Sequence, residues 1–160
     1  MIHQFVCECE NVQETQKLAE AVSETAEKGD TFALFGTLGA GKSVFARAFV
    51  QHLTGADEVP SPTFTLVQTY QADEFEIFHY DLYRLKSEEE IWELDMQEAL
   101  YEAVNLIEWP EKMKAYLPRD IFKVSILPVG NKRQIKIEVI SDEKAKRLKT
   151  IKALKEASCV

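Results

Sequence analysis

The sequence predicts an α/β fold: a mixed sheet with a parallel centre and antiparallel hairpins, and helices on both faces. Two short and almost wholly apolar runs, 31–35 (TFALF) and 103–109 (AVNLIEW), have the composition of strands that are covered on both sides. Two pairs of strand-like segments, each joined by a polar turn, indicate hairpins. With 160 residues and no Pro-, Gly- or Ser-rich linker, we expect a single domain over 1–160.

The first part of the chain alternates strands and helices. Residues 2–9 alternate apolar and polar side chains, which predicts a strand. Asn11 with Glu14 three residues later forms a capping-box pattern, so we expect a helix that runs to about Lys28. After the 31–35 strand, a second helix should end at Gly55, and its apolar face contains Phe45, Phe49 and Leu53.

The second part is richer in strands. Segments 64–70 and 75–83 flank the polar stretch QADE and predict one hairpin. Segments 121–128 and 133–140, joined by VGNK, predict a second hairpin. From residue 142 onward the apolar side chains recur at three-residue steps, which predicts a basic C-terminal helix over 142–160.

Charge and targeting signals narrow the class of protein. The net charge of −8 argues against broad binding of nucleic acid. Residues 142–160 carry six Lys/Arg and three Asp/Glu, a local charge of +3. A solvated helix packed through its apolar stripe is favoured there over a contact face for RNA. The chain has no signal-peptide pattern and no long apolar run, so we expect a cytoplasmic protein without a membrane segment. Its three cysteines are expected to be reduced thiols.

A glycine-rich motif follows the 31–35 strand. Gly36, Gly41, Lys42 and Ser43 satisfy the pattern G-x-x-x-x-G-K-[ST], and a strand before it and a helix after it are the setting that a phosphate-binding loop (P-loop) requires. The main-chain N–H groups of such a loop surround phosphate oxygens, the lysine reaches the β- and γ-phosphates, and the hydroxyl binds Mg²⁺. We therefore expect ATP and Mg²⁺ as ligands and a P-loop NTPase fold. The N–H donors should come from Leu38, Gly39, Ala40, Gly41, Lys42, Ser43 and Val44.

Such a loop also needs an acidic side chain at the end of a neighbouring strand. Glu108 ends a buried run and is our choice for the second magnesium ligand. Asp81 could orient the attacking water or join the outer magnesium shell, and it could equally cap the strand end or pair with Arg84. His79 is expected to be a packed histidine, and Trp109 is expected at the edge of the nucleotide pocket.

Three further stretches narrow the superfamily. SPTFTLVQTY at 61–70, HYDLYRL at 79–85 and LIEWPE at 106–111, together with the glycine motif, strongly resemble the bacterial TsaE family, also called YjeE or YdiB. The resemblance extends from about Asn11 to about Ile140. It implies a small ATPase required for threonylcarbamoylation of the adenosine beside the anticodon in tRNAs that read codons beginning with A.

The same resemblance implies partners. A TsaE-like protein is not the group-transferring enzyme; it binds a TsaB–TsaD heterodimer and its ATP hydrolysis resets that machine between rounds. We expect weak hydrolysis by the chain alone and faster hydrolysis with the partners, and we favour indirect over direct contact with tRNA. The acidic segment 87–100 could supply part of the partner surface or form an ordinary amphipathic helix, which the Ser87–Glu90 capping pattern would begin.

Site residues carry over from the family by motif. Lys42, Ser43 and Glu108 would hold phosphate and magnesium, and Asp81 would be important for hydrolysis. Further family positions near the nucleotide would be Thr15, Ser61, Thr63, Trp109 and Arg133. Two departures are visible: Ser43 replaces the commoner threonine, and Thr37 stands where the family usually has an acid.

Three other functions remain open on the sequence. A small-molecule or nucleotide kinase shares the P-loop, but the five arginines are scattered. A GTPase is suggested by NKRQ at 131–134, although the aspartate that would bind guanine is absent. A non-catalytic module could use ATP only to stabilise an assembly.

Overall fold

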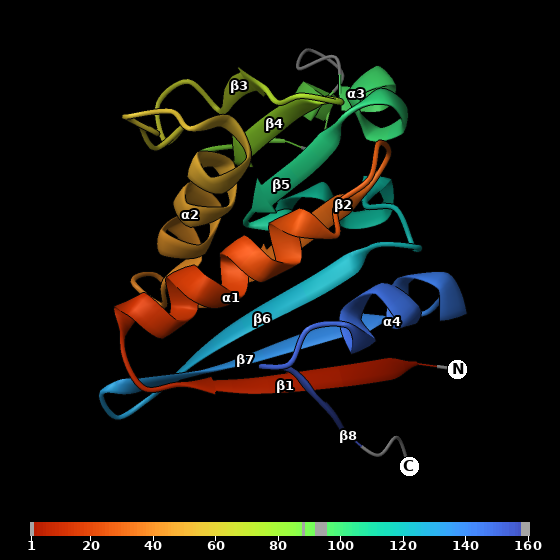
Figure 1. Cartoon of the computed structure of the whole chain (residues 1–160). Helices are drawn as coiled ribbons and strands as arrows, with labels where there is room; N and C mark the ends of the chain where they lie inside the picture. Colours follow the sequence, from red (N-terminus) through yellow and green to blue (C-terminus); the bar gives the residue numbers. More distant parts are fainter. Residues whose placement is uncertain (1, 88, 92–95, 158–160) are drawn as a thin grey trace.

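The computed structural model describes residues 2–87, 89–91 and 96–157 (Figure 1). Within these residues eight strands form one sheet in the order β3-β4-β5-β2-β6-β7-β1-β8. The strands are β1 (His3–Cys9), β2 (Thr31–Phe35), β3 (Val67–Gln71), β4 (Glu76–Asp81), β5 (Val104–Glu108), β6 (Phe122–Val129), β7 (Lys132–Val139) and β8 (Lys155–Ala157). The helices are α1 (Val12–Glu24), α2 (Lys42–Thr54), α3 (Met96–Glu102) and α4 (Asp142–Lys149), with 3₁₀ turns, η2, over Pro110–Tyr116.

The sheet is mixed, as the sequence predicts. Its centre is parallel, because β4 runs beside β5, β5 beside β2, and β2 beside β6 in the same direction. The pairs β3/β4 and β6/β7 form the two expected antiparallel hairpins. Strand β1 lies antiparallel to β7 at the far side of the sheet. All parallel strands of the centre therefore end at one edge, where ligands bind in α/β folds.

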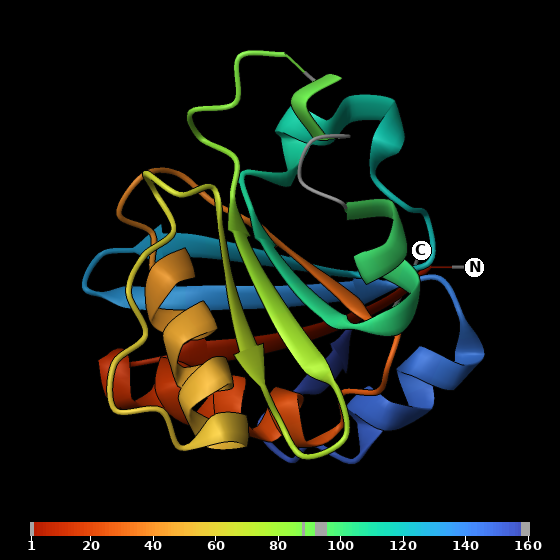
Figure 2. The same ribbon diagram turned by 90° about the horizontal axis from the view of Figure 1, so that it is seen from above.

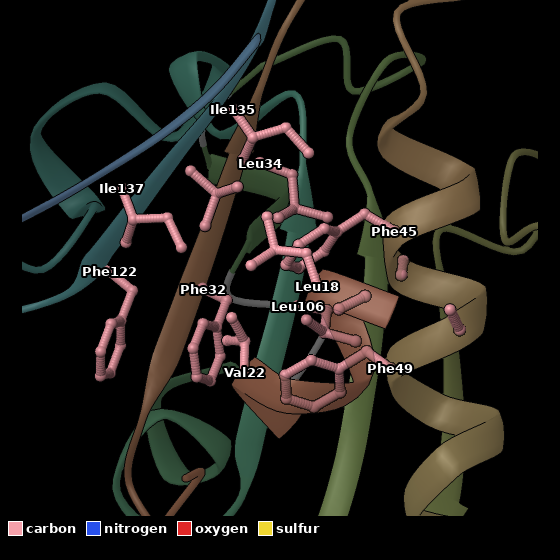
Figure 3. Packing of buried hydrophobic residues seen from close by; sticks show 14 of the residues in the cluster. Leu18, Val22, Phe32, Leu34, Phe45, Phe49, Leu106, Phe122, Ile135 and Ile137 are labelled. Carbon is pink, nitrogen blue, oxygen red and sulfur yellow. The ribbon is translucent and has the colours of Figure 1, made fainter. Parts of the chain in front are cut away.

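Two apolar cores cover the two faces of the sheet. Helices α1, α2 and α4 pack on one face, and α3 with η2 pack on the other (Figures 1 and 2). In the larger core the ring of Phe32 stacks on Phe122 at 4.5 Å between centroids and meets Phe49 of α2 edge-on at 5.0 Å (Figure 3). Aromatic pairs of this kind contribute about 0.5–1.5 kcal/mol beyond their burial. They fix α2, and therefore the loop before it, against β2.

Helix α1 ends at Glu24, so the predicted extension to Lys28 is wrong. The hydroxyl of Thr25 donates to the carbonyl of Val22 at 2.8 Å, and the backbone then turns. Asp30 holds this turn because its carboxylate accepts the N–H of Glu27 at 2.8 Å. A Thr or Asp side chain that bonds the nearby main chain competes with continued helix.

The predicted helix over 142–160 is also wrong in its extent. Helix α4 stops at Lys149, and β8 then pairs with β1. The N–H groups of Ile151 and Leu154 donate to carbonyls three residues earlier, so the chain turns with a period of three residues. That period matches the three-residue spacing of the apolar stripe better than the 3.6 residues of an α-helix. The apolar stripe is buried as expected; it consists of Ala145, Leu148, Ile151 and Leu154. Residues 158–160 of the predicted helix lie outside the described residues.

Only part of the acidic segment 87–100 lies among the described residues. Glu90 accepts the N–H groups of Lys86 and Ser87 at 2.6 and 3.3 Å, which is the backward reach of a capping box. Only a single 3₁₀ turn over 89–91 follows within the described residues. Glu88, Trp92 and Leu94 lie outside them, whereas Met96 begins α3 and is buried in the smaller core. In the part of the chain that the structure describes, every helix is too short or too polar to cross a membrane.

Candidate nucleotide-binding site

The loop between β2 and α2 is shaped by its glycines. A Cβ atom on Gly36 would lie 2.9 Å from the carbonyl oxygen of Ile126 on β6, so only glycine lets the loop approach that strand. Gly41, directly before α2, has a φ of 116°, in the left-handed region that favours glycine. The predicted loop therefore forms at the carboxyl end of the central strand.

The N-terminus of α2 differs from those of α1 and α4. Asn11 and Ser141 accept N–H groups in the first turns of α1 and α4, at 2.9 and 3.2 Å. Gly41 precedes α2 and offers no side-chain cap, and the first turn of α2 holds no acidic residue. Because the first N–H groups of a helix have no partner within the helix, this end is free to receive an anion.

Lys42 lies at this end of α2 and is almost wholly buried, with 5% of its surface exposed. Its Nζ donates to the carbonyl of Gly36 at 2.6 Å and lies 3.4 Å from the centre of the Trp109 ring. Burial lowers the pKa of Lys42, while the carboxylates of Glu108, Glu111 and Asp81 act in the opposite direction. The ammonium is thus held beside the loop by contacts that a phosphate could replace.

Ser43 meets Glu108 directly. The hydroxyl of Ser43 donates to Oε1 of Glu108 at 3.1 Å, although the two residues belong to α2 and to the end of β5. A hydroxyl and a carboxylate oxygen are ligands that suit Mg²⁺, which usually takes one or two protein ligands and completes its shell with phosphate and water. The described residues contain no cluster of three or more His, Cys, Asp and Glu side chains that could hold a metal alone. The hydroxyl of Ser43 and the carboxylate of Glu108 therefore fit a magnesium ion that takes its remaining ligands from phosphate and water.

Asp81 pairs with Glu108 across the β4–β5 register, so both carboxylates lie at the same edge of the sheet. Its Oδ1 accepts the N–H of Tyr83 at 3.0 Å, and its Oδ2 accepts the hydroxyl of Thr63 at 3.3 Å. Asp81 thus caps the strand end, one of the alternatives that the sequence left open, and also holds the SPTF loop through Thr63. Arg84, the other candidate partner, stacks on the ring of Phe64 at 4.5 Å.

Trp109 has an uncommon backbone. Its φ of 60° lies in the left-handed region, which bulky residues rarely adopt. The following proline disfavours the right-handed helical conformation at this position. The left-handed bend places the ring against Lys42 and 4.9 Å from the ring of Tyr83. The structure therefore places Trp109 beside the P-loop lysine.

Arg133 reaches the other flank of the loop. Nε of Arg133 donates to the carbonyl of Ala40 at 2.8 Å. Arg133 pairs with Cys9 across β7 and β1. Hydrogen bonds from Cys7 and, to a smaller extent, from Thr15 lower the pKa of Cys9 to about 7. Arg133 thus contacts the loop directly, whereas the buried Thr15 lies behind Cys9.

The structure brings most of the predicted site residues together. Contacts at the carboxyl edge of the sheet link the loop with Lys42, Ser43, Thr63, Asp81, Glu108, Trp109 and Arg133. At the tip of the loop Leu38 is exposed, while Ala40 is buried. A hollow of about 600 Å³ beside this loop is lined by Leu38, Trp109 and Glu111, among others. A hollow of similar size, about 630 Å³, lies between α3 and η2, and both hollows are mainly apolar. The loop side is singled out instead by the contacts that bring Lys42, Ser43 and Glu108 together.

His79 is packed, as the sequence predicts, but its contact with Glu108 was not predicted. Its Nε2 lies 2.7 Å from Oε2 of Glu108, and each residue is 2% exposed. The available signal was the spacing: His79 lies two residues before Asp81, on the same side of β4, and β4 is the direct neighbour of β5.

A mixed sheet whose central strand passes through this loop into a helix defines a protein of the P-loop fold. A crystal structure of Bacillus subtilis YdiB matches 94% of the chain and 95% of YdiB, with a TM-score of 0.77 and 25% sequence identity. The family model of the threonylcarbamoyl adenosine biosynthesis protein TsaE matches residues 9–137. The chain therefore belongs to the TsaE family.

Individual members of the family are similar over most of their length. The tRNA threonylcarbamoyladenosine biosynthesis protein TsaE of Rickettsia felis is 44% identical over 135 residues, which are 83% of this chain and 79% of that protein. The protein of the same name from Bacillus subtilis is 33% identical over 122 residues, 76% of each chain.

Proposed function

We propose that the chain binds ATP with Mg²⁺ at the P-loop, hydrolyses it slowly, and serves as a cytoplasmic accessory protein in the synthesis of threonylcarbamoyladenosine in tRNA. Its partner in this proposal is a TsaB–TsaD heterodimer, which stimulates hydrolysis and itself handles the tRNA. Membership of the TsaE family supports the pathway, since the relatives are named for it.

The observation that carries the nucleotide proposal is the contact of Ser43 with Glu108 next to an uncapped helix N-terminus. This contact joins the motif hydroxyl to a strand-end carboxylate, and Lys42 lies beside them as the only buried lysine within the loop motif. A turn needed only for tight packing would explain Gly36 but not this arrangement of hydroxyl, carboxylate and ammonium.

In the proposed mechanism each side chain has one task. The N–H groups of the loop and Lys42 bind the phosphates, and Lys42 exchanges the carbonyl of Gly36 for a phosphate oxygen. Ser43 and Glu108 would hold Mg²⁺, and the ion would supply positive charge beside the phosphates. Asp81 orients the attacking water, and its bond to Thr63 links this step to the position of the SPTF loop.

An ATPase assay with and without a purified TsaB–TsaD pair tests the proposal. We expect slow release of ADP and inorganic phosphate by the chain alone, a faster rate with the pair, and ATP preferred over GTP in competition. Ser43→Ala should lower the rate at least tenfold, because it removes a proposed magnesium ligand, whereas the matched change Ser141→Ala before α4 should not.

Two results would contradict the proposal. Equal rates with and without the pair would remove the accessory role. Transfer of the phosphoryl group to a metabolite instead of water would identify a kinase.

A further inference from the structure

His79 and Glu108 form a buried pair that the proposed mechanism leaves without a task. The pair lies between β4 and β5 with 2% exposure for each residue, and Nε2 of His79 is 2.7 Å from Oε2 of Glu108. Removing one partner of such a buried pair is costly, because it leaves a carboxylate buried without a hydrogen-bond partner.

The direction of the hydrogen bond follows from its partners. A carboxylate oxygen accepts, so Nε2 of His79 carries the hydrogen and donates it. Nδ1 of His79 is buried and has no hydrogen-bond partner among the described residues. A hydrogen on Nδ1 would be buried without an acceptor, which favours the tautomer with the hydrogen on Nε2.

The two oxygens of Glu108 therefore have different partners. Oε2 accepts from His79 on β4, and Oε1 accepts from Ser43 at the start of α2. With Oε2 fixed by a rigid ring on a central strand, the plane of the carboxylate is set, and Oε1 is directed at the hydroxyl that the proposal assigns to Mg²⁺. Without this bond the terminal torsion of Glu108, which is intrinsically broad, would be free to turn.

We infer that His79 is a positioning residue for magnesium: it donates to Glu108 and thereby holds the other carboxylate oxygen toward the metal and the nucleotide phosphates. His79 itself touches neither ligand. The inference rests on the proposed function, because it assigns Mg²⁺ to Ser43 and Glu108. Outer partners of metal-binding carboxylates typically change metal affinity by about 10- to 100-fold when they are removed.

The strand offers matched variants. His79→Met removes the donor at similar side-chain length, and His79→Gln places an amide N–H near the position of Nε2. Ile77→Val is the control. Ile77 is wholly buried and lies two residues before His79 on the same side of β4, and the change to valine removes a methylene group but no hydrogen-bond donor. All three variants change a buried side chain on the same side of β4, but only His79→Met removes the hydrogen-bond donor to Glu108.

The test measures binding of a fluorescent ADP derivative by anisotropy, first without metal and then with increasing MgCl₂. For His79→Met we expect the half-saturating Mg²⁺ concentration to rise about 10- to 100-fold, while affinity for the metal-free nucleotide stays within about twofold. His79→Gln should return the Mg²⁺ requirement to within about threefold of the unmodified chain, and Ile77→Val should leave it unchanged.

The outcomes separate the two proposals. If the unmodified chain does not bind the nucleotide, the proposed function fails and this inference fails with it. If the unmodified chain binds it in a Mg²⁺-dependent manner and His79→Met has the same Mg²⁺ requirement, only the inference is overturned. An equal rise in the half-saturating Mg²⁺ concentration for His79→Met and Ile77→Val would assign His79 to packing alone and would also overturn the inference.

A measurement on the unmodified chain covers the case in which His79→Met does not fold. The ¹⁵N chemical shifts of the His79 ring should show the hydrogen on Nε2. A hydrogen on Nδ1 alone would leave Glu108 without its donor and overturn the inference.

Discussion

Replacement of Lys42 by alanine tests the electrostatics of the site most directly. One phosphate charge about 4 Å from the ammonium is worth about 4 kcal/mol at an effective dielectric constant of about 20. Lys42 must first leave two contacts, the carbonyl of Gly36 at 2.6 Å and the ring of Trp109 at 3.4 Å. These are worth about 1.5 and about 1 kcal/mol. The net gain from Lys42 is about 1.5 kcal/mol, which corresponds to about a tenfold loss of affinity in Lys42→Ala.

Isothermal titration with a non-hydrolysable ATP analogue at fixed Mg²⁺ and salt measures this loss. Lys123→Ala is the matched control, because it removes the same charge from an exposed position on β6. Its affinity should stay within about twofold, since an exposed charge is largely screened. Equal affinities for Lys42→Ala and the unmodified chain would refute the assignment of Lys42 to the phosphates. Equal losses in both variants would show that net charge, not the local contact, governs binding.

Three further predictions concern pH, the loop and the C-terminal region. Burial lowers the pKa of Lys42 in the free protein, so its ammonium loses its charge at a pH below the ordinary lysine pKa of 10.5. Affinity for the ATP analogue should therefore already fall as the pH rises toward that value, and Lys42→Ala should show no such fall. Gly36→Ala should lower the free energy of unfolding by about 3 kcal/mol through its clash with β6 and its backbone conformation. Gly39→Ala, whose Cβ would have nothing within 4 Å, should lower it by only about 1 kcal/mol, and equal losses in urea unfolding would contradict the reasoning. Arg147→Met should lower the free energy of unfolding by about 3 kcal/mol, because the buried carboxylate of Asp30 loses its counter-charge. Adding Asp30→Asn should restore most of the loss. A loss below about 1 kcal/mol in the single variant would show that the ion pair is not important for stability.

The parallel centre and the loop could be predicted because their signals are local. TFALF and AVNLIEW are short apolar runs, and the glycine motif between a strand and a helix has a mechanism attached to each residue. The sequence placed Asp81 and Glu108 at strand ends, whereas their side-by-side position comes from the register of β4 and β5, which the structure shows.

The C-terminal region could not be predicted from its own residues. A three-residue apolar spacing suits a helix face and also a series of 3₁₀ turns, and the choice depends on what lies nearby. Here the free edge of β1 takes up Lys155–Ala157 as β8, a pairing between the two ends of the chain. The contact of His79 with Glu108 also depends on strand neighbours, because the two residues lie 29 positions apart; the spacing from Asp81 gives only the side of β4 on which His79 lies.

The place of β1 in the sheet has a consequence for biosynthesis. β1 is synthesised before all the other strands of the sheet, yet its neighbours are β7 and β8, which follow the five strands β2 to β6 along the chain. Such distant pairing slows folding, because the chain must close a long loop before it gains any contact. The nascent chain therefore carries β1 without its sheet partner until Val139 has emerged. Arg133 is part of β7, so the contacts of the candidate nucleotide site are also completed only after β7 has been made.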